Sequence, residues 1–292
     1  MQLVFKILFI LVSVCLSSCL QDYDIDFDKT QNILILNAEL EPDEEIKVLV
    51  ALPKIPTQHG DYFTPSDAIV TVFEEGELFE VLTYKVNEGV TSGIYVSSKK
   101  PVPGKTYRVE ARYGELPVVS AVQKVQGYPE IENIFFDKEI TGIRDTGTVK
   151  VELVFKENAS PERYFAIDNY IIVDYLNKES EVDTSRFTLS TSFEEGFRDL
   201  RGFWTVLSKS PHTISYKLLL NNMKLLESDS VLSVKFYISV DELSRDGYVY
   251  RDSYRVRNND NYGEPNLVFS NIVNGLGIFS SRANVRSSYI IK

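Results

Sequence analysis

The first hundred residues after position 32 alternate between short apolar runs and clusters of turn-forming residues. Between Lys105 and Tyr113 apolar and charged residues alternate one by one, which is typical of a strand with one buried face. Gly, Pro or Asn bounds most of the other runs. The spacing predicts a β-sandwich over residues 32–126. Its seven predicted strands are 33–38, 46–52, 68–73, 78–84, 93–97, 105–113 and 118–125.

Gly127-Tyr128-Pro129 interrupts the pattern and predicts a boundary between two domains. Beyond it, further strands are expected at 131–136, 148–155, 164–176, 186–191 and 231–239. Ser239 and Glu242 then have the spacing of a capping box, and apolar residues follow at helical intervals, so a helix is expected at about 240–256. We therefore expect residues 127–292 to form a second β-rich domain with one or two helices.

The last apolar segment, residues 265–279, is too rich in apolar side chains for a loose terminus. Leu267-Val268-Phe269 is expected to form a buried strand. Leu276 and Ile278 are expected to point inward, between glycines that let another segment approach closely. The side-chain amides of Asn271 and Asn274 are expected to satisfy turn backbone. This segment should therefore be packed structure.

Composition narrows the functional classes. An apolar content of 43% is that of a globular protein, and a formal charge of −11 argues against nucleic acid as a partner. It also argues against charge-driven binding to an anionic membrane. The only cysteines are Cys15 and Cys19, and the only histidines, His59 and His212, do not have a paired metal-ligand spacing. We expect both histidines to be exposed and no cofactor to be bound.

The amino terminus has the layout of a secretory signal. Lys6 precedes an apolar run from Ile7 to Leu16, which is about half of the ~20 residues that a membrane-spanning helix needs. The next residues complete Leu16-Ser17-Ser18-Cys19, which resembles a bacterial lipobox. That resemblance implies lipidation of Cys19, cleavage before it, and a membrane anchor. Residues 1–18 are then the signal peptide, and residues 19–31 an acidic tether.

Within that tether, aspartates alternate with aromatic and aliphatic residues from Asp22 to Asp28. A calcium loop would need a central glycine and a closing glutamate, which are both missing, so a solvated tether is the favoured interpretation. A second calcium arrangement, Asn258–Asn261 with Glu264, is likewise less favoured than a solvated loop.

Several short motifs, taken in order, resemble a family. Gly93-Ile94-Tyr95 with Pro103-Gly104-Lys105-Thr106-Tyr107 resembles prealbumin-like and carboxypeptidase-regulatory β-sandwiches. We therefore expect the first domain to be an immunoglobulin-like or prealbumin-like sandwich. The closing Ser270-Asn271-Ile272 and Gly275-Leu276-Gly277-Ile278-Phe279 resemble the signature of a Bacteroidota lipoprotein family, domain of unknown function 4249. That resemblance implies an outer-membrane lipoprotein, often encoded beside TonB-dependent transporters, and brings no catalytic residues with it.

Motifs for chemistry are sparse. The sequence has no Gly-x-Ser-x-Gly elbow, and carboxylate pairs such as Glu74/Glu75 and Glu194/Glu195 are more typical of a surface than of a glycosidase. We therefore expect a non-enzymatic accessory or ligand-capture partner of an outer-membrane transporter. The alternative is a stand-alone surface adhesin or glycan-binding module. Trp204 and Tyr262 are the candidate ligand-facing aromatics, and their clustering would favour direct ligand binding.

Overall fold

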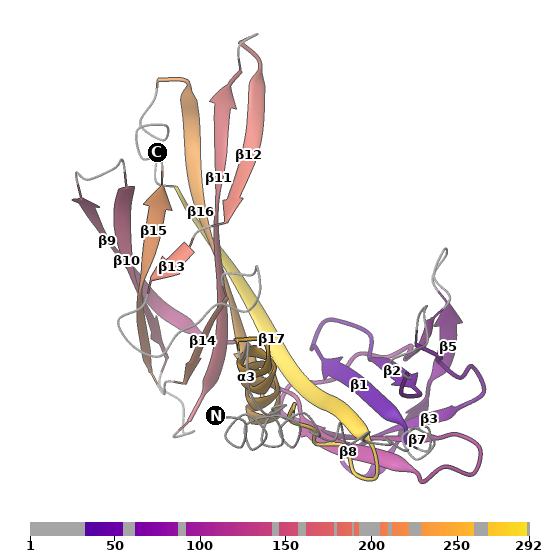
Figure 1. Ribbon diagram of the computed structural model, residues 1–292. Helices are drawn as coiled ribbons and strands as arrows, with labels where there is room; N and C mark the ends of the chain where they lie inside the picture. The colour runs from indigo at the N-terminus through magenta and orange to yellow at the C-terminus, as the bar shows by residue number, and fades with distance from the viewer. Residues whose placement is uncertain are drawn as a thin grey trace, which may run out of the picture. The chain divides into compact units, whose positions relative to one another are not determined.

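The computed structural model describes most of the chain after residue 32 (Figure 1). The described ranges are 33–54, 62–86, 92–141, 146–156, 162–177, 180–188, 190–192, 205–209, 212–221, 229–259 and 268–290. They belong to one compact unit formed by residues 33–292. The unit is mainly β, as the sequence predicts.

The strands of the first half follow the apolar runs closely. The expected strand at 78–84 is in fact two strands, because the chain leaves one sheet at Leu82 and enters another. The strands are β1 (Ile35–Leu40), β2 (Lys47–Ala51), β3 (Ile69–Glu74), β4 (Glu77–Val81), β5 (Thr83–Val86), β6 (Gly93–Val96), β7 (Thr106–Arg112) and β8 (Val119–Lys124).

The second half contains longer strands and one described helix. The strands are β9 (Ile131–Thr141), β10 (Thr146–Phe155), β11 (Tyr164–Leu176), β12 (Val182–Thr188), β13 (Ser190–Ser192), β14 (Thr205–Lys209), β15 (Thr213–Asn221), β16 (Val231–Leu243) and β17 (Leu276–Ile290). The helix is α3 (Arg245–Asn259). No helix in the described ranges is both long and apolar enough to span a bilayer.

Among the described residues, the strands form one sheet of nine and two sheets of four. The long sheet has the order β12-β11-β16-β17-β1-β2-β6-β5, with β14 also paired to β11. Strand β17 joins its two parts, because it pairs with β16 in antiparallel fashion and with β1 in parallel fashion. The smaller sheets are β4-β3-β7-β8 and β13-β15-β10-β9.

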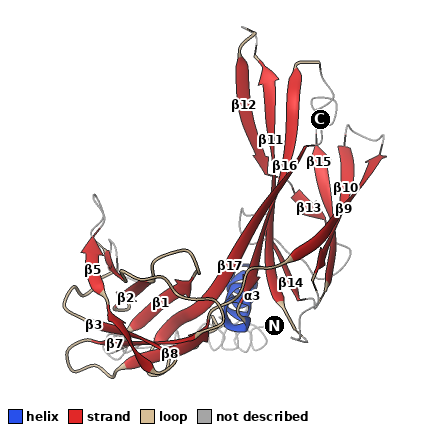
Figure 2. Cartoon of the chain, turned by 180° about the vertical axis from the view of Figure 1, so that it is seen from behind, coloured by secondary structure: helices blue, strands red, loops and turns tan. Residues whose placement is uncertain are grey.

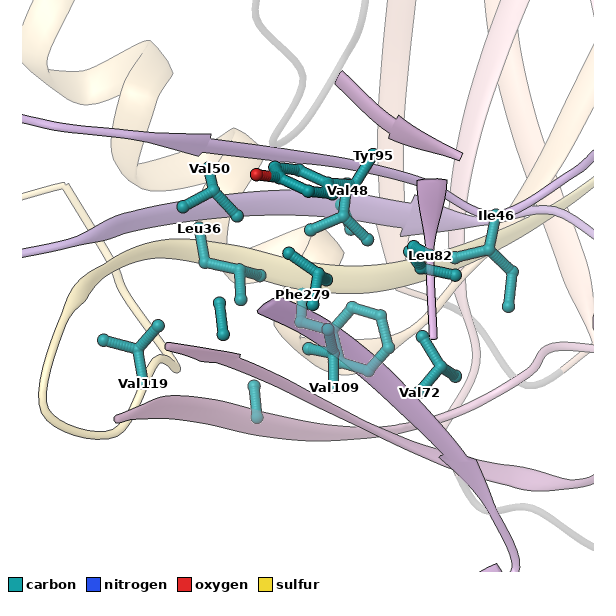
Figure 3. Packing of buried hydrophobic residues seen from close by; sticks show 14 of the residues in the cluster. Leu36, Ile46, Val48, Val50, Val72, Leu82, Tyr95, Val109, Val119 and Phe279 are labelled. Atoms are coloured by element: carbon teal, nitrogen blue, oxygen red, sulfur yellow. The ribbon is translucent and has the colours of Figure 1, made fainter. Parts of the chain in front are cut away.

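The first hydrophobic core lies between the β1-β2 part of the long sheet and the sheet β4-β3-β7-β8. Alternate residues of each strand are buried, as in Tyr107, Val109 and Ala111 of β7. Phe279, which comes from β17 near the far end of the chain, is fully buried between the two layers (Figure 3). Two sheets therefore share this core, and the carboxyl-terminal strand completes it.

The second hydrophobic core is built from residues between Val151 and Val240. The long strands β10, β11 and β16 supply every second side chain to it, and Phe155 stacks on Phe165 with ring centroids 4.3 Å apart. Tyr289 of β17 packs against it from the side. Strand β17 therefore contributes to both cores: Phe279 belongs to the first, and Tyr289 packs against the second.

The structure corrects the expected start of the helix. Residues 240–243 continue β16 and are buried, so the helix begins at Arg245. Its amino-terminal cap is Ser244, whose Oγ accepts a hydrogen bond from the amide of Gly247 at 3.2 Å. The reason is that alternate burial through Ile238 and Val240 extends the strand past the apparent capping box. The helix lies beside β17 (Figure 2).

The carboxyl-terminal segment is packed in its described part, but two expectations about it are wrong. Val268 and Phe269 are not in a strand, and β17 begins only at Leu276. Leu276 is exposed, whereas Ile278 and Phe279 are buried. Asn271 and Asn274 satisfy backbone groups as expected: the Asn271 amide bonds the carbonyl and the N–H of Phe279, and Asn274 Nδ2 donates to the Val118 carbonyl.

Candidate functional site

A polar pocket of about 830 Å³ lies beside the connection from β8 to β9, and we call it the junction pocket. It is lined by groups from the connection itself, from the residues before β11 and from the end of β16. Its charged lining residues are Lys124, Glu130, Lys156, Glu162, Arg163, Glu242 and Arg245.

A buried ion pair forms one wall of the junction pocket. Arg163 Nε and Nη2 donate to the two carboxylate oxygens of Glu242 at 3.0 and 2.6 Å. The register of β11 and β16 explains the contact, because Phe165 stands opposite Glu242 and Arg163 lies two residues before Phe165. The Arg163 side chain is only 4% exposed. The pair is therefore held almost entirely away from water.

Aromatic rings support the same arginine. Its guanidinium carbon lies 5.3 Å from the ring centre of Phe155 and 5.0 Å from that of Phe165. Nη1 also donates to the Lys156 carbonyl at 3.3 Å. A buried ion pair rarely adds net stability over apolar replacements, although removal of one partner leaves a costly buried charge. Arg163 thus connects this wall of the pocket to Phe155 and Phe165 of the second core.

The rim of the junction pocket carries exposed, weaker pairs. Lys156 Nζ donates to Glu130 at 2.7 Å, and this hydrogen bond lowers the pKa of Glu130 and raises that of Lys156. Tyr128 donates its hydroxyl proton to Asp43, and this bond together with partial burial raises the pKa of Tyr128 to about 12. The phenol proton is thus held by the Asp43 carboxylate.

The chemistry of the junction pocket is that of polar recognition. Guanidinium, ammonium, carboxylate, amide and phenol groups lie around one hollow and supply both hydrogen-bond donors and acceptors. Convergent polar groups of this kind orient a ligand within a pocket. No motif in the sequence indicated this site, because Arg163 and Glu242 lie 79 residues apart and the only pattern that includes Glu242, the apparent capping box, predicts a helix start.

A second charged cluster lies where β17 passes between the two cores. Arg282 Nε contacts Glu39 at 3.0 Å and its Nη2 contacts Glu41 at 2.7 Å, while Arg251 of α3 contacts Glu39 at 3.1 Å. Asp241 accepts from Asn284 at 2.6 Å beside them. These contacts join β1, β16, β17 and α3, so their role is structural.

Most of the candidate site residues named from the sequence lie outside the described part of the chain. Cys19, Trp204, Tyr262, Glu194 and Glu195 lie outside the described residues, as do His59 and the tether aspartates. The second calcium arrangement also falls largely outside them, and the described residues contain no cluster of three or more metal-ligating side chains.

Two of the remaining candidates, Glu74 and His212, make contacts within the fold. Glu74 accepts hydrogen bonds from Lys105 and from Tyr107, and these bonds lower its pKa. His212 is half-buried rather than exposed, because its backbone carbonyl pairs with Phe155 and holds it against the second core. Neither residue lines the junction pocket.

Comparison with known proteins identifies one matching protein family. The protein family described as Domain of unknown function (DUF4249) matches residues 21–288. No curated protein matches the chain.

Proposed function

The chain belongs to the family of domain of unknown function 4249, and from this membership and its amino-terminal sequence we propose that it is a lipid-anchored, non-enzymatic binding protein of the outer membrane. Its role would be to hold a ligand or a partner beside an outer-membrane transporter. The observation that carries the proposal is the lipobox-like Leu16-Ser17-Ser18-Cys19 at the end of a short apolar run.

Lipid attachment at Cys19 would account for membrane association of an acidic chain. Burial of acyl chains contributes about 0.8 kcal/mol per methylene, and stable anchoring takes two or more chains. A chain with a formal charge of −11 gains nothing from an anionic lipid surface. The anchor therefore has to be the lipid itself.

Binding is favoured over catalysis by the groups that the chain offers. If the leader is removed and Cys19 is lipidated, no thiol is left for nucleophilic chemistry, and the sequence has no paired histidines. The junction pocket supplies donors and acceptors around a hollow large enough for a small polar ligand. These features support ligand capture, with a protein partner as the receiver of that ligand.

The anchor is tested by the variant Cys19→Ser, with Cys15→Ser as the matched control four residues earlier. We expect Cys19→Ser to give an unlipidated precursor or a soluble form, because the thioether cannot form. Cys15→Ser should stay with the membrane fraction. Fractions are compared after a high-salt wash, which removes charge-mediated association and leaves lipid burial. Retention of Cys19→Ser in washed membranes would disprove lipid anchoring at this residue.

The partner is tested by crosslinking in intact envelopes. A photo-crosslinking residue is placed at Lys124, on the rim of the junction pocket, and at Val182, an exposed residue that does not line it. An accessory role predicts a crosslink to an outer-membrane transporter from Lys124 and not from Val182. Absence of a transporter crosslink from Lys124 would argue for a stand-alone adhesin or glycan-binding module instead.

A further inference from the structure

The three carboxylates that line the junction pocket each accept a hydrogen bond from a neighbouring side chain. Those of Glu130 and Glu242 belong to the ion pairs with Lys156 and Arg163. The carboxylate of Glu162 accepts the hydroxyl proton of the next tyrosine but one at 2.7 Å. Each carboxylate therefore already has a donor from within the fold, and none depends on a ligand for one.

Two cationic side chains of the same lining have no such partner. Lys124 and Arg245 are exposed, and neither forms an ion pair with any residue in the described part of the chain. With four cationic and three carboxylate side chains, the lining is net positive on a chain whose formal charge is −11. A hollow with an excess of one charge concentrates ions of the opposite charge, so this pocket favours an anion.

Lys124 and Arg245 are brought to the same hollow by one residue of β17, Ser281. Its Oγ accepts a hydrogen bond from the amide of Gln126, two residues after Lys124, at 2.8 Å. Its carbonyl accepts from the amide of Ser244, directly before Arg245, at 2.8 Å, and its own amide donates to Ser244 Oγ at 3.1 Å. Ser281 is fully buried, so these bonds are shielded from water. The fold therefore fixes the backbone on both sides of the pocket.

The end of β8 that carries Lys124 is held from its other side as well. The amide of Val125 donates to the Lys105 carbonyl at 2.9 Å, and the Val125 carbonyl accepts from the amide of Gly104 at 3.0 Å. Gly104 and Val125 both line the pocket. Binding of an anion therefore has to order long side chains but little backbone, which lowers the entropic cost of binding.

The remaining groups of the pocket narrow the anion to one that carries hydroxyls. Arg245 offers a planar fork of donors that matches a carboxylate or a phosphate, and Lys124 offers a compact positive charge. The ionised carboxylates of Glu130 and Glu162 have further lone pairs and can only accept, so they suit the hydroxyls of a ligand. A volume of about 830 Å³ is that of a pocket for an organic ligand rather than for a lone inorganic ion.

We propose that the ligand of the junction pocket is a small hydroxylated anion, of the class of sugar acids and sugar phosphates. Its acidic group binds Lys124 and Arg245, and its hydroxyls donate to Glu130 and Glu162. This inference rests on the ligand capture proposed above for the same pocket, and it adds the chemistry of the ligand. Carboxylate and phosphate share this chemistry, and the choice of probes separates them.

Isothermal titration calorimetry tests the ligand class on the chain from residue 19 onward with Cys19→Ser, which retains the compact unit of residues 33–292. The probes are glucuronate, glucose 6-phosphate and neutral glucose. We expect at least one of the two anions to bind about ten times more tightly than glucose, because hydrogen bonds to charged groups contribute that much or more. The anion that binds more tightly identifies the acidic group.

Substitution of the two cations tests their part in binding. Lys124→Gln and Arg245→Gln should each weaken binding of the anion about tenfold. Lys85→Gln on β5 and Arg286→Gln on β17 are the matched controls, because they remove exposed cations that do not line the pocket, and they should leave the affinity unchanged. All four variants make the same change in net charge, so they separate local contact from the overall field. Thermal melts confirm that each variant is folded.

Each contrary result has its own meaning. Glucose binding as tight as that of the anions would overturn the ligand class and leave ligand capture in place. Binding of none of the three probes at millimolar concentration would overturn both the ligand class and capture in this pocket. Equal weakening by Lys85→Gln and Lys124→Gln would overturn the contact, because the anion would then respond only to overall charge. The membrane anchor is tested by fractionation and does not depend on any of these results.

Discussion

The first hydrophobic core is assembled from both ends of the chain, whereas the second comes from the stretch between Val151 and Val240. In the first core, residues from Leu34 to Val125 are joined by Ile272 and Phe279. In the second, the long strands pair in antiparallel fashion; β9 and β10 are joined by a short connection, whereas the partners in β10–β15 and β11–β16 lie 56 to 79 residues apart. The difference lies in β17, which is the parallel partner of β1 across some 240 residues.

This comparison shows how differently the two cores depend on distant sequence. The antiparallel pairs of the second core can form once residues 131–243 are present, because each closes a loop of at most some 80 residues. The parallel pairing of β1 with β17 can form only when almost the whole described chain is present. The first core is therefore complete only with its carboxyl-terminal strand, although its own eight strands end at Lys124.

The largest expected effect follows from separating the first half. A fragment of residues 30–126 ends at the proposed boundary but lacks Ile272 and Phe279, so we expect it to show no cooperative thermal transition by circular dichroism. In the full chain, Phe279→Ala should destabilise the fold by roughly 3–5 kcal/mol, since it leaves a cavity between two sheets. Cooperative melting of the fragment would show that the first eight strands suffice and would remove the contrast between the cores.

The next effect concerns the buried ion pair beside the second core. Arg163→Met should cost about 3 kcal/mol in urea unfolding, because it leaves the Glu242 carboxylate buried without its partner. The double variant Arg163→Met with Glu242→Leu should recover most of that loss. If the double variant were as unstable as the single one, the loss would not come from the unpaired carboxylate, and the pair itself would stabilise the fold.

The smallest effect is at the seam between β1 and β17. Gly277 has a φ of +118°, and a Cβ there would overlap the Leu36 carbonyl, so Gly277→Val should cost roughly 1–3 kcal/mol through overpacking. Gly76, with a φ of +94°, has open space around it, so Gly76→Val isolates the cost of backbone strain alone. Equal losses for the two variants would mean that close approach of the strands contributes nothing measurable.

The sequence by itself determined the β class, most strands and the packing of the described carboxyl-terminal residues. Alternation of buried and exposed side chains has a period of two within a strand, so residues such as Tyr107, Val109 and Ala111 reveal their buried face locally. The roles of Gly277, Asn271 and Asn274 could likewise be predicted from residue type. A glycine tolerates a positive φ and a close neighbour, and an asparagine amide can bond to turn backbone.

Only the tertiary structure decided where these elements pair. A capping-box pattern at Ser239–Glu242 predicts a helix, but continued burial along β16 between its neighbours β11 and β17 keeps these residues in the strand. Nothing in the local pattern shows that Phe279 fills the first core or that Arg163 meets Glu242. These contacts depend on sheet order and register, and their free energy arises from burial between segments that the chain brings together only on folding.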